Sequence, residues 1–347
     1  MLPELLPSSP ELALAQGRWV KVIGGASNQD LEALEDLAGL FSLAGVHCLD
    51  VAADRAVVAA TRRGIAWAEV RGARPPWLMV SLSDGVDPHF RKAWFDPDRC
   101  PRDCSRPCER VCPALAIPPG AAVLEERCYG CGRCLPACPH GLISERQHVL
   151  AAEAVPSLLR DLRPDAVELH TRIGRQAAFA ERVAQLRSSG VGLRRVAVSC
   201  GLEPPETLET LAASLWRRHQ CLRQAGFKPL FQLDGRPMSG DVGAGTAHAA
   251  VQLLDRLAPM APPGPLQLAG GTNASTLPLL ERRPAAARRA AGVAFGGVAR
   301  SLLQECLQAA RQRSCRLLDA EDLWPGALAL ACSLVKPWLL RPGIPAR

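Results

Sequence analysis

The 347-residue chain is poor in aromatic side chains, in lysine and in long apolar runs. Aromatic residues make up 4% of it, with Tyr129 as the single tyrosine, so stacking platforms for single-stranded nucleic acid are scarce. The longest apolar run, residues 327–335, is much shorter than the roughly 20 residues of a membrane-spanning helix. Residues 1–16 lack the basic start of a secretory signal. We therefore predict a cytoplasmic protein with no transmembrane segment.

The positive charge of the chain comes almost entirely from arginine. Lys and Arg number 41 against 34 Asp and Glu, a formal net charge of +7, and four of these cations are lysines. The arginines are scattered, and the densest group, at 282–289, falls on a predicted surface helix. This distribution is typical of a solvated surface rather than of a basic groove that binds the phosphate backbone of a nucleic acid. We predict no nucleic-acid partner.

Cysteine is plentiful by contrast, and its placement is informative. The chain has 14 cysteines, of which eight lie between residues 100 and 138 and six are dispersed. Without a secretory signal we expect reduced thiols, so the clustered cysteines indicate metal binding rather than disulfides. The dispersed ones are typical of small buried side chains.

Residues 128–139 have the spacing C-x2-C-x2-C-x3-C-P of bacterial ferredoxins. Gly130 and Gly132 allow a tight loop in which three sulfurs converge on one cluster, while the fourth cysteine binds the neighbouring cluster. Zinc is the alternative, but zinc sites usually pair one C-x2-C with a distant second pair. The spacing therefore favours iron–sulfur clusters.

A second cysteine run, at 100–113, ends in the same C-x3-C-P, with one extra residue in each of its first two gaps. We predict a ferredoxin-like module with two clusters related by pseudo-twofold symmetry. By the crossed-ligand rule, cluster one takes Cys128, Cys131, Cys134 and Cys112, and cluster two takes Cys100, Cys104, Cys108 and Cys138. Both are predicted to be 4Fe-4S, with 3Fe-4S as the alternative for cluster two because its spacing is wider.

Apolar strand-like runs alternate with longer amphipathic stretches in the rest of the chain. Strands are predicted at 19–27, 48–54, 77–83, 166–171, 195–201, 229–235, 265–273 and 292–299, and helices at 31–43, 175–187, 206–225, 246–257 and 301–311. Eight such units predict an α/β fold, a TIM-like (β/α)8 barrel, and an open doubly wound parallel sheet is the alternative. The predicted parts are a tail (1–16), the first part of the barrel (17–83), the ferredoxin-like insert (84–150), the remainder of the barrel (151–311) and a helical extension (312–347).

The predicted insert follows the third strand, so it leaves the barrel at the face where barrel active sites are built. Two glycine-containing loops after the seventh and eighth strands belong to the same face, and such loops often bind phosphate. We take their residues as candidates for binding FMN or another phosphorylated molecule. They are Gly270, Gly271, Thr272, Asn273, Gly296 and Gly297.

Polar residues stand at alternate positions within the apolar strands. Residues i and i+2 of a strand share a face, so these side chains are expected to point into the barrel. They form either a substrate pocket or a satisfied structural network. They are Lys21, Asp50, Glu168, His170, Gln232 and Asp234. We find no hydrolytic triad, Walker loop or Rossmann fingerprint, and we assign no catalytic residue.

Residues 17–27 and 43–54, together with the two cysteine runs, resemble the cyanobacterial light-dependent period (LdpA) family. The resemblance implies an iron–sulfur protein that senses cellular redox state and reports light or photosynthetic electron flow to the circadian clock. It also implies association with clock components such as KaiA and CikA, and it places the cluster ligands on the eight cysteines named above.

Two functions follow from these patterns. In the first, the chain is a redox sensor that exchanges electrons with cellular carriers, and the charge change alters how the insert fits on the barrel rim. In the second, it is an iron–sulfur oxidoreductase that holds FMN or a phosphorylated substrate in the glycine loops. Because no catalytic signature is present, the sensor is the favoured hypothesis.

Overall fold

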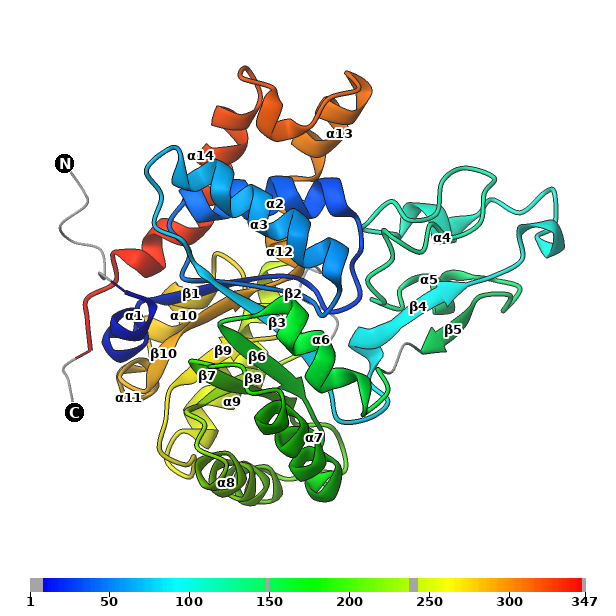
Figure 1. Ribbon diagram of the computed structural model, residues 1–347. Helices are drawn as coiled ribbons and strands as arrows, with labels where there is room; N and C mark the ends of the chain where they lie inside the picture. The colour runs from blue at the N-terminus through cyan, green and yellow to red at the C-terminus, as the bar shows by residue number, and fades with distance from the viewer. Residues whose placement is uncertain (1–8, 148–149, 237–242, 345–347) are drawn as a thin grey trace.

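A closed barrel of eight parallel strands forms the body of the computed structural model, which describes residues 9–147, 150–236 and 243–344 (Figure 1). The strand order around the barrel is β1-β10-β9-β8-β7-β6-β3-β2. The strands are β1 (Trp19–Gly25), β2 (Cys48–Ala52), β3 (Trp77–Ser83), β6 (Ala166–His170), β7 (Arg195–Gly201), β8 (Pro229–Asp234), β9 (Leu266–Ala269) and β10 (Ala290–Phe295). Because β1 pairs with both β2 and β10, the barrel prediction is confirmed and the open sheet is excluded.

Glycine conformation sets the ends of the last two strands. The predicted strand at 265–273 stops at Ala269, because Gly270 and Gly271 adopt positive φ angles of 65° and 91° that extended backbone does not allow. The predicted strand at 292–299 is shifted to Ala290–Phe295. It stops before Gly296, whose φ of −108° and ψ of −100° depart from extended backbone, and a helix begins at Gly297. Both glycine loops therefore lie beyond the strands, at the carboxyl rim.

Helices cover the outside of the barrel and follow the strands in the expected alternation. They are α2 (Leu31–Leu43), α3 (Arg55–Glu69), α6 (Ala154–Leu162), α7 (Gln176–Ser188), α8 (Leu208–Gln224), α9 (Ala247–Leu257), α10 (Thr276–Glu281), α11 (Pro284–Ala287), α12 (Gly297–Leu302) and α13 (Gln304–Gln312). Helix α2 begins after Asp30 because that side chain accepts a hydrogen bond from the Ala33 amide at 3.2 Å. The single helix predicted at 301–311 is divided into α12 and α13 at the buried Leu303.

The barrel interior is layered from its amino end to its carboxyl rim. Its floor is apolar, with Trp19, Trp77 and Met79 packed among small strand residues. Helix α1 (Pro10–Gln16), within the predicted tail, covers this floor and buries Ala13 and Leu14 there. Polar side chains fill the layers above. Any ligand must therefore enter from the carboxyl rim.

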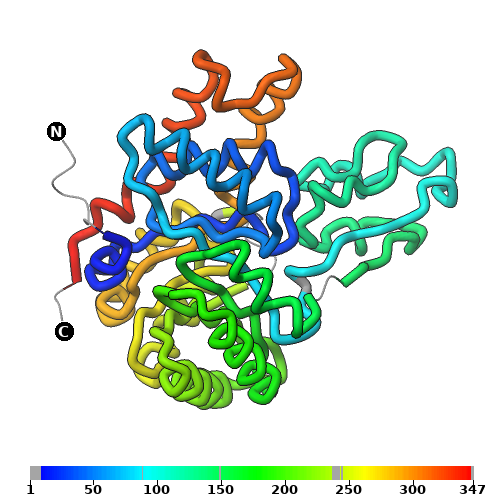
Figure 2. The backbone as a smooth tube through the Cα atoms, viewed as in Figure 1, coloured from blue at the N-terminus to red at the C-terminus, as the bar shows by residue number. Residues whose placement is uncertain are grey.

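The chain leaves the barrel between β3 and α6 and returns after residue 147. We call residues 91–147 the cysteine segment. It holds the antiparallel pair β4 (Arg91–Trp94) and β5 (Ser144–Gln147) and the short helices η3 (Pro97–Arg99), α4 (Pro107–Arg110) and α5 (Cys134–Ala137). Figure 2 shows it in cyan and green, projecting from one side of the barrel.

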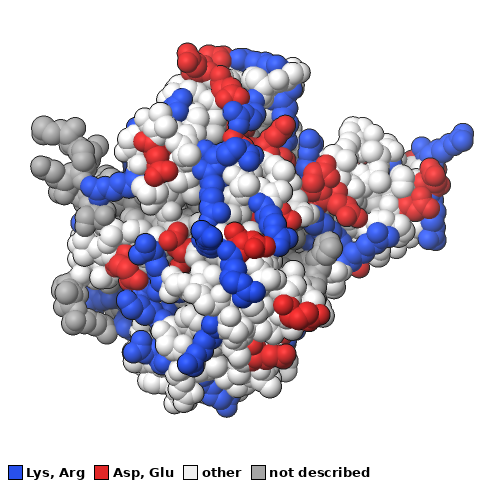
Figure 3. Space-filling model, viewed as in Figure 1, with Lys and Arg blue, Asp and Glu red and all other residues white. Residues whose placement is uncertain are grey.

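The C-terminal part packs against the first barrel units. A short turn, η5 (Leu317–Asp319), lies against α2. The Asp36 carboxylate of α2 accepts hydrogen bonds from the backbone amides of Leu317 and Leu318, each at 3.1 Å. Helix α14 (Trp324–Leu339) then runs over α2 and β1. On the face drawn in Figure 3, basic and acidic side chains are interspersed, as the scattered arginines predict.

Candidate functional site

Four cysteines from two parts of the sequence line one apolar cavity within the cysteine segment. Cys112 ends the first run, while Cys128, Cys131 and Cys134 belong to the second. Burial, and then the neighbouring thiols, raise the pKa of Cys134 to about 12. Four thiols at such close range resist ionisation unless a cationic core is bound among them. The donor set and its apolar surroundings therefore fit an iron–sulfur cluster.

The other four cysteines of the two runs also approach one another. The Cys100 thiol hydrogen-bonds with that of Cys104 and lies within electrostatic range of Cys138. The thiol of Cys108, from the same run, also interacts with Cys138. Cys138 thus lies with the first run, just as Cys112 lies with the second. These are the thiols that the crossed-ligand rule assigns to cluster two, and that assignment stays a prediction.

Backbone amides donate hydrogen bonds to the cysteine sulfurs. The amide of Ala116 lies 3.2 Å from the Sγ of Cys112, and the amide of Leu142 lies 3.4 Å from the Sγ of Cys138. In both cases the donor stands four residues after the final cysteine of a C-x3-C-P run. Two further bonds run from Ala93 to Cys128, at 3.3 Å, and from Arg106 to Cys104, at 3.4 Å. Such bonds tune the potential of sulfur-bound clusters.

The two cysteine runs also share a backbone path. Two residues before Cys108 and Cys134, the chain adopts positive φ angles, 46° at Arg106 and 75° at Gly132. Three residues after the final cysteine of each run it does so again, at Leu115 (51°) and Gly141 (61°). The short helices α4 and α5 pack together between these positions. The cysteine segment is therefore built as two similar halves.

A buried ionic network occupies the centre of the barrel. Lys21 forms ion pairs with Asp50, at 2.7 Å, and with Glu168, and all three side chains are withdrawn from solvent. Burial raises the pKa of Asp50 to about 7, while Lys21 holds the pKa of Glu168 below its usual range against the effect of burial. Ser81 donates to the second Asp50 oxygen at 2.8 Å. These charges are mutually satisfied, as a structural network requires.

The network continues upward to the rim. Gln232 donates to Glu168 Oε1 at 2.9 Å, and Ser199 donates to Asp234 at 2.6 Å. His170 places its Nε2 atom 3.0 Å from the same Glu168 oxygen. Of the six predicted interior residues, His170, Gln232 and Asp234 border a cavity, whereas Lys21, Asp50 and Glu168 lie beneath it.

The rim cavity, of about 100 Å³, lies between the barrel and the cysteine segment. Its lining includes Gly270, Gly271, Thr272, Gly296 and Gly297 of the two glycine loops, with Tyr129 and Cys131 of the cysteine segment. Asn273 is not part of the lining, because its side chain turns towards Gly243 and Thr246 in the neighbouring loop. The Thr272 hydroxyl donates to the Ala294 carbonyl.

Several contacts attach the cysteine segment to the barrel. The Arg300 guanidinium, from α12, lies 4.0 Å above the Tyr129 ring and donates to the Ile23 carbonyl at 2.9 Å. Gln29 lies in the loop after β1. Its side-chain oxygen accepts a hydrogen bond from Lys92 at 2.6 Å, and its backbone N–H donates to the Glu126 carbonyl at 2.8 Å. Lys92 also lines a cavity of about 230 Å³ at this junction. The segment is thus attached near the carboxyl end of β1.

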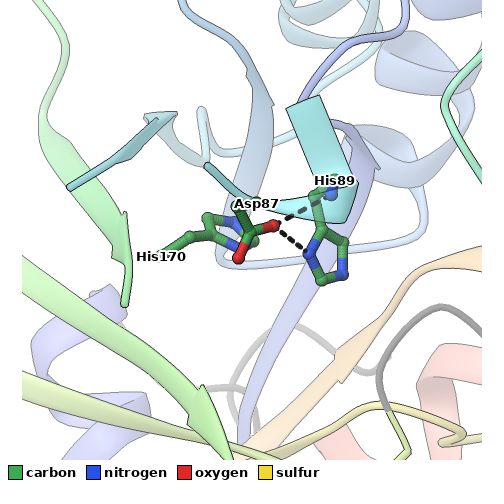
Figure 4. Close-up of side chains that lie close together, drawn as sticks. All are labelled: Asp87, His89 and His170. Carbon is green, nitrogen blue, oxygen red and sulfur yellow. Dashed lines mark hydrogen bonds and ion pairs between the residues drawn. The ribbon is translucent and has the colours of Figure 1, made fainter. Parts of the chain in front are cut away.

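Asp87 and His89, which are not among the residues predicted from the sequence, lie beside His170 at the rim (Figure 4). The available signal is a D-x-H triplet that begins four residues after the end of the predicted strand at 77–83. A turn at that point of a parallel barrel lies at the carboxyl rim. Sequence alone does not tell which strand's side chains the turn faces, so the link with His170 could not be predicted.

Similarity to known proteins covers both parts of the molecule. Two family models match, the Light dependent period A C-terminal domain over residues 158–337 and the LdpA Fe-S cluster-binding domain over residues 100–149. Light dependent period A of Synechococcus elongatus is 45% identical over 336 residues, which span 95% of this chain and 94% of that protein.

The comparison with solved structures gives matches at low identity. Tryptophan synthase from M. tuberculosis has a TM-score of 0.44 and 13% identity, with 96% of this chain and 97% of that chain covered. The carboxyl transferase domain of Rhizobium etli pyruvate carboxylase has a TM-score of 0.45 and 10% identity, with coverages of 99% and 51%. These similarities are too remote to inform on function.

Within the described ranges, no helix combines the length and the apolar character needed to cross a membrane. The cysteine runs match an iron–sulfur cluster-binding model, and a relative of 45% identity is covered almost from end to end. The chain therefore belongs to the light dependent period A family, as its resemblance to that family predicts.

Proposed function

We propose that the chain is a cytoplasmic redox sensor that binds two iron–sulfur clusters and relays light-dependent redox state to the circadian clock. Cys112, Cys128, Cys131 and Cys134 hold the first cluster, and Cys100, Cys104, Cys108 and Cys138 hold the second. The observation that carries this proposal is the exchange of Cys112 and Cys138 between the two runs. When bound, such clusters accept and release single electrons.

The protein's own contribution is to hold and shield the sulfurs. Phe95, Ile117 and Ile143 pack around the buried cysteines and keep water away from them. The amide bonds to Cys112 and Cys138 stabilise negative charge on those sulfurs. Lys92, which is buried beside Cys128, acts in the same direction. These contacts favour the more negative, reduced state.

The route by which the barrel registers a change of charge starts at Cys131, which lies at the rim cavity with Tyr129. Tyr129 contacts Arg300, and Arg300 in turn contacts the end of β1 through the Ile23 carbonyl. A charge gained or lost at the Cys131 sulfur changes the force on the Arg300 cation. A partner reads the resulting shift, and the family resemblance suggests clock components such as KaiA and CikA.

Anaerobic electron paramagnetic resonance, with iron quantified, tests the cluster assignment. The wild type is expected to carry about eight iron atoms per chain, and Cys128→Ser about half of that. Cys221→Ser, in α8 outside both runs, serves as the control and is expected to keep the wild-type iron content. A chain prepared anaerobically that contains no iron contradicts the proposal.

Sensing is tested separately by hydrogen exchange in the oxidised and dithionite-reduced protein. We expect the amides of residues 23–30 and 297–302 to change protection with reduction, because they meet the cysteine segment. The amides of α8, which packs against β7, β8 and α9 on the outside of the barrel, serve as the internal reference. Equal protection of residues 23–30 and 297–302 in both states contradicts the sensing route and leaves the cluster assignment intact.

An oxidoreductase that holds a phosphorylated ligand is the second candidate, because five of the six glycine-loop candidates line the cavity that Cys131 also borders. The cavity is about 100 Å³, below the roughly 300 Å³ at which small-molecule sites usually begin, so FMN fits it poorly. Heat denaturation should release no yellow cofactor from the purified protein. Release of one flavin per chain would favour this candidate over the sensor.

A further inference from the structure

Three metal-ligating side chains meet at the barrel rim, outside both groups of cysteines. Asp87 and His89 belong to the turn after β3, where η2 (Pro88–Phe90) lies, and His170 ends β6. One candidate ligand atom from each residue lies within 4.8 Å of the other two. In Figure 4, Asp87 is placed between the two imidazole rings. Bound ligand atoms around one metal ion are about 3–4 Å apart, so small rotations complete the geometry.

The orientation of His170 is fixed from beneath. Its Nε2 atom lies 3.0 Å from Glu168 Oε1, and Glu168 is itself held by Lys21. The other ring nitrogen, Nδ1, is then the one that can bind a metal. A carboxylate that accepts from the far nitrogen of a histidine is the usual support of a metal-binding imidazole. The barrel network thus supplies this support.

The turn after β3 presents its two ligands together. The Asp87 Oδ1 atom accepts from the His89 amide at 2.9 Å and lies 2.7 Å from the His89 Nδ1 atom. The imidazole rings of His89 and His170 are 4.7 Å apart at their centroids. Asp87 and His170 are buried, while His89 keeps partial contact with solvent. Asp87 and His89 are therefore pre-arranged, with the more exposed His89 on the open side.

We propose that Asp87, His89 and His170 bind one divalent transition-metal ion. Two imidazoles and one carboxylate form a ligand set that leaves coordination positions open, as in non-haem iron and catalytic zinc sites. The open positions face cavities of about 100 and 40 Å³ that His89 and His170 border. Water or a small oxygen ligand completes the coordination there. Because Cys131 also borders the larger cavity, the metal ion and the cysteine segment lie at the same rim cavity.

Equilibrium dialysis of the full-length protein against zinc, with metal counted by mass spectrometry, tests the proposal. The wild type is expected to bind about one zinc ion per chain more than His89→Ala or Asp87→Asn. His248→Ala, on the exposed face of α9, is the control and should match the wild type. Metal held by the cysteines cancels in these differences, so the result does not depend on the cluster assignment.

Ligand identity is tested by X-ray absorption at the zinc edge. The part of the spectrum that is lost in His89→Ala should show nitrogen and oxygen neighbours at about 2.0–2.2 Å. Equal zinc counts in the wild type, His89→Ala and Asp87→Asn overturn the proposal, as does a lost component with sulfur neighbours only. Circular dichroism and the unfolding midpoint establish that both variants fold.

Discussion

The barrel and the cysteine segment bury side chains of different kinds. Beneath its helices the barrel has a continuous cluster of Leu, Val, Ile and Phe. The buried cluster of the cysteine segment has few such residues, and Cys108, Cys128 and Cys134 are among its members. Its helices and strands are also short, with α4, α5, β4 and β5 each four residues long. The comparison indicates that apolar burial folds the barrel, whereas the cysteine segment depends on what its thiols bind.

The largest effect is expected from removing a cysteine ligand. Cys134→Ser should abolish most hydrogen-exchange protection across residues 91–147, because the bound cluster supplies the folding energy that so small a core lacks. Barrel strands should keep their protection. Exchange measured by mass spectrometry under anaerobic conditions checks both statements.

Cys221→Ser, in α8, is the matched control and should leave the cysteine segment protected. If Cys134→Ser lowered protection in the barrel strands as much as in residues 91–147, the two regions would fold as one unit. That result would contradict the conclusion that the barrel and the cysteine segment are stabilised by different interactions.

Within the barrel, the largest expected loss follows from breaking its buried ion pairs. Lys21→Met leaves Asp50 and Glu168 without their cation and should reduce the free energy of unfolding by about 3–5 kcal/mol. Urea denaturation measures this loss. Arg55→Met, which breaks an exposed ion pair with Asp161, is the comparison and should cost less than about 1 kcal/mol.

Acid should destabilise the barrel through His47. Burial lowers the pKa of this histidine to about 4, while its Nδ1 atom accepts from the Val20 amide at 3.1 Å. The unfolded chain binds a proton near pH 6.5 and the folded chain only near pH 4, so stability falls as pH decreases through this range. The expected contribution is about 3 kcal/mol. His47→Asn, which retains an acceptor, should show a correspondingly flatter pH profile in denaturation experiments.

The smallest effect concerns the contact between the two regions. Tyr129→Leu removes the ring that Arg300 covers and should weaken attachment of the cysteine segment by about 1 kcal/mol, or about fivefold in exchange protection at residues 23–30. Tyr129→Phe retains the ring and should behave like the wild type. A loss in both variants would show that the hydroxyl, not the aromatic face, makes the contact.

The sequence predicts most of the fold because its signals are local. Residues 31–43 are predicted to be helical and form α2, because their apolar spacing is a signal carried within a few turns of chain. Strand alternation directs Glu168 and His170 to the barrel interior, where the structure has both. The predicted strand ends are wrong where backbone conformation decides. The apolar pattern predicts a strand to residue 273, but the positive φ of Gly270 ends β9 at Ala269.

The rim is harder to predict because its residues meet through tertiary structure. Asp87 and His89 stand about 80 residues before His170, and only the strand order places their turn beside β6. Asn273 belongs to a glycine-containing loop, yet its amide group bonds within the neighbouring loop instead of lining the cavity. Motif spacing gives no information about either contact.

The two ends of the described chain meet at the floor of the barrel. Ile344 donates to the Gln16 carbonyl at 3.0 Å, and Arg341 donates to Gly17 and Ala290 at 2.9 and 3.1 Å. This junction lies away from the cysteine segment, as Figure 1 shows. A fluorophore or surface tether fused at either end would therefore leave the rim accessible. A permuted gene that joins the two ends and opens the chain elsewhere should also keep the barrel intact.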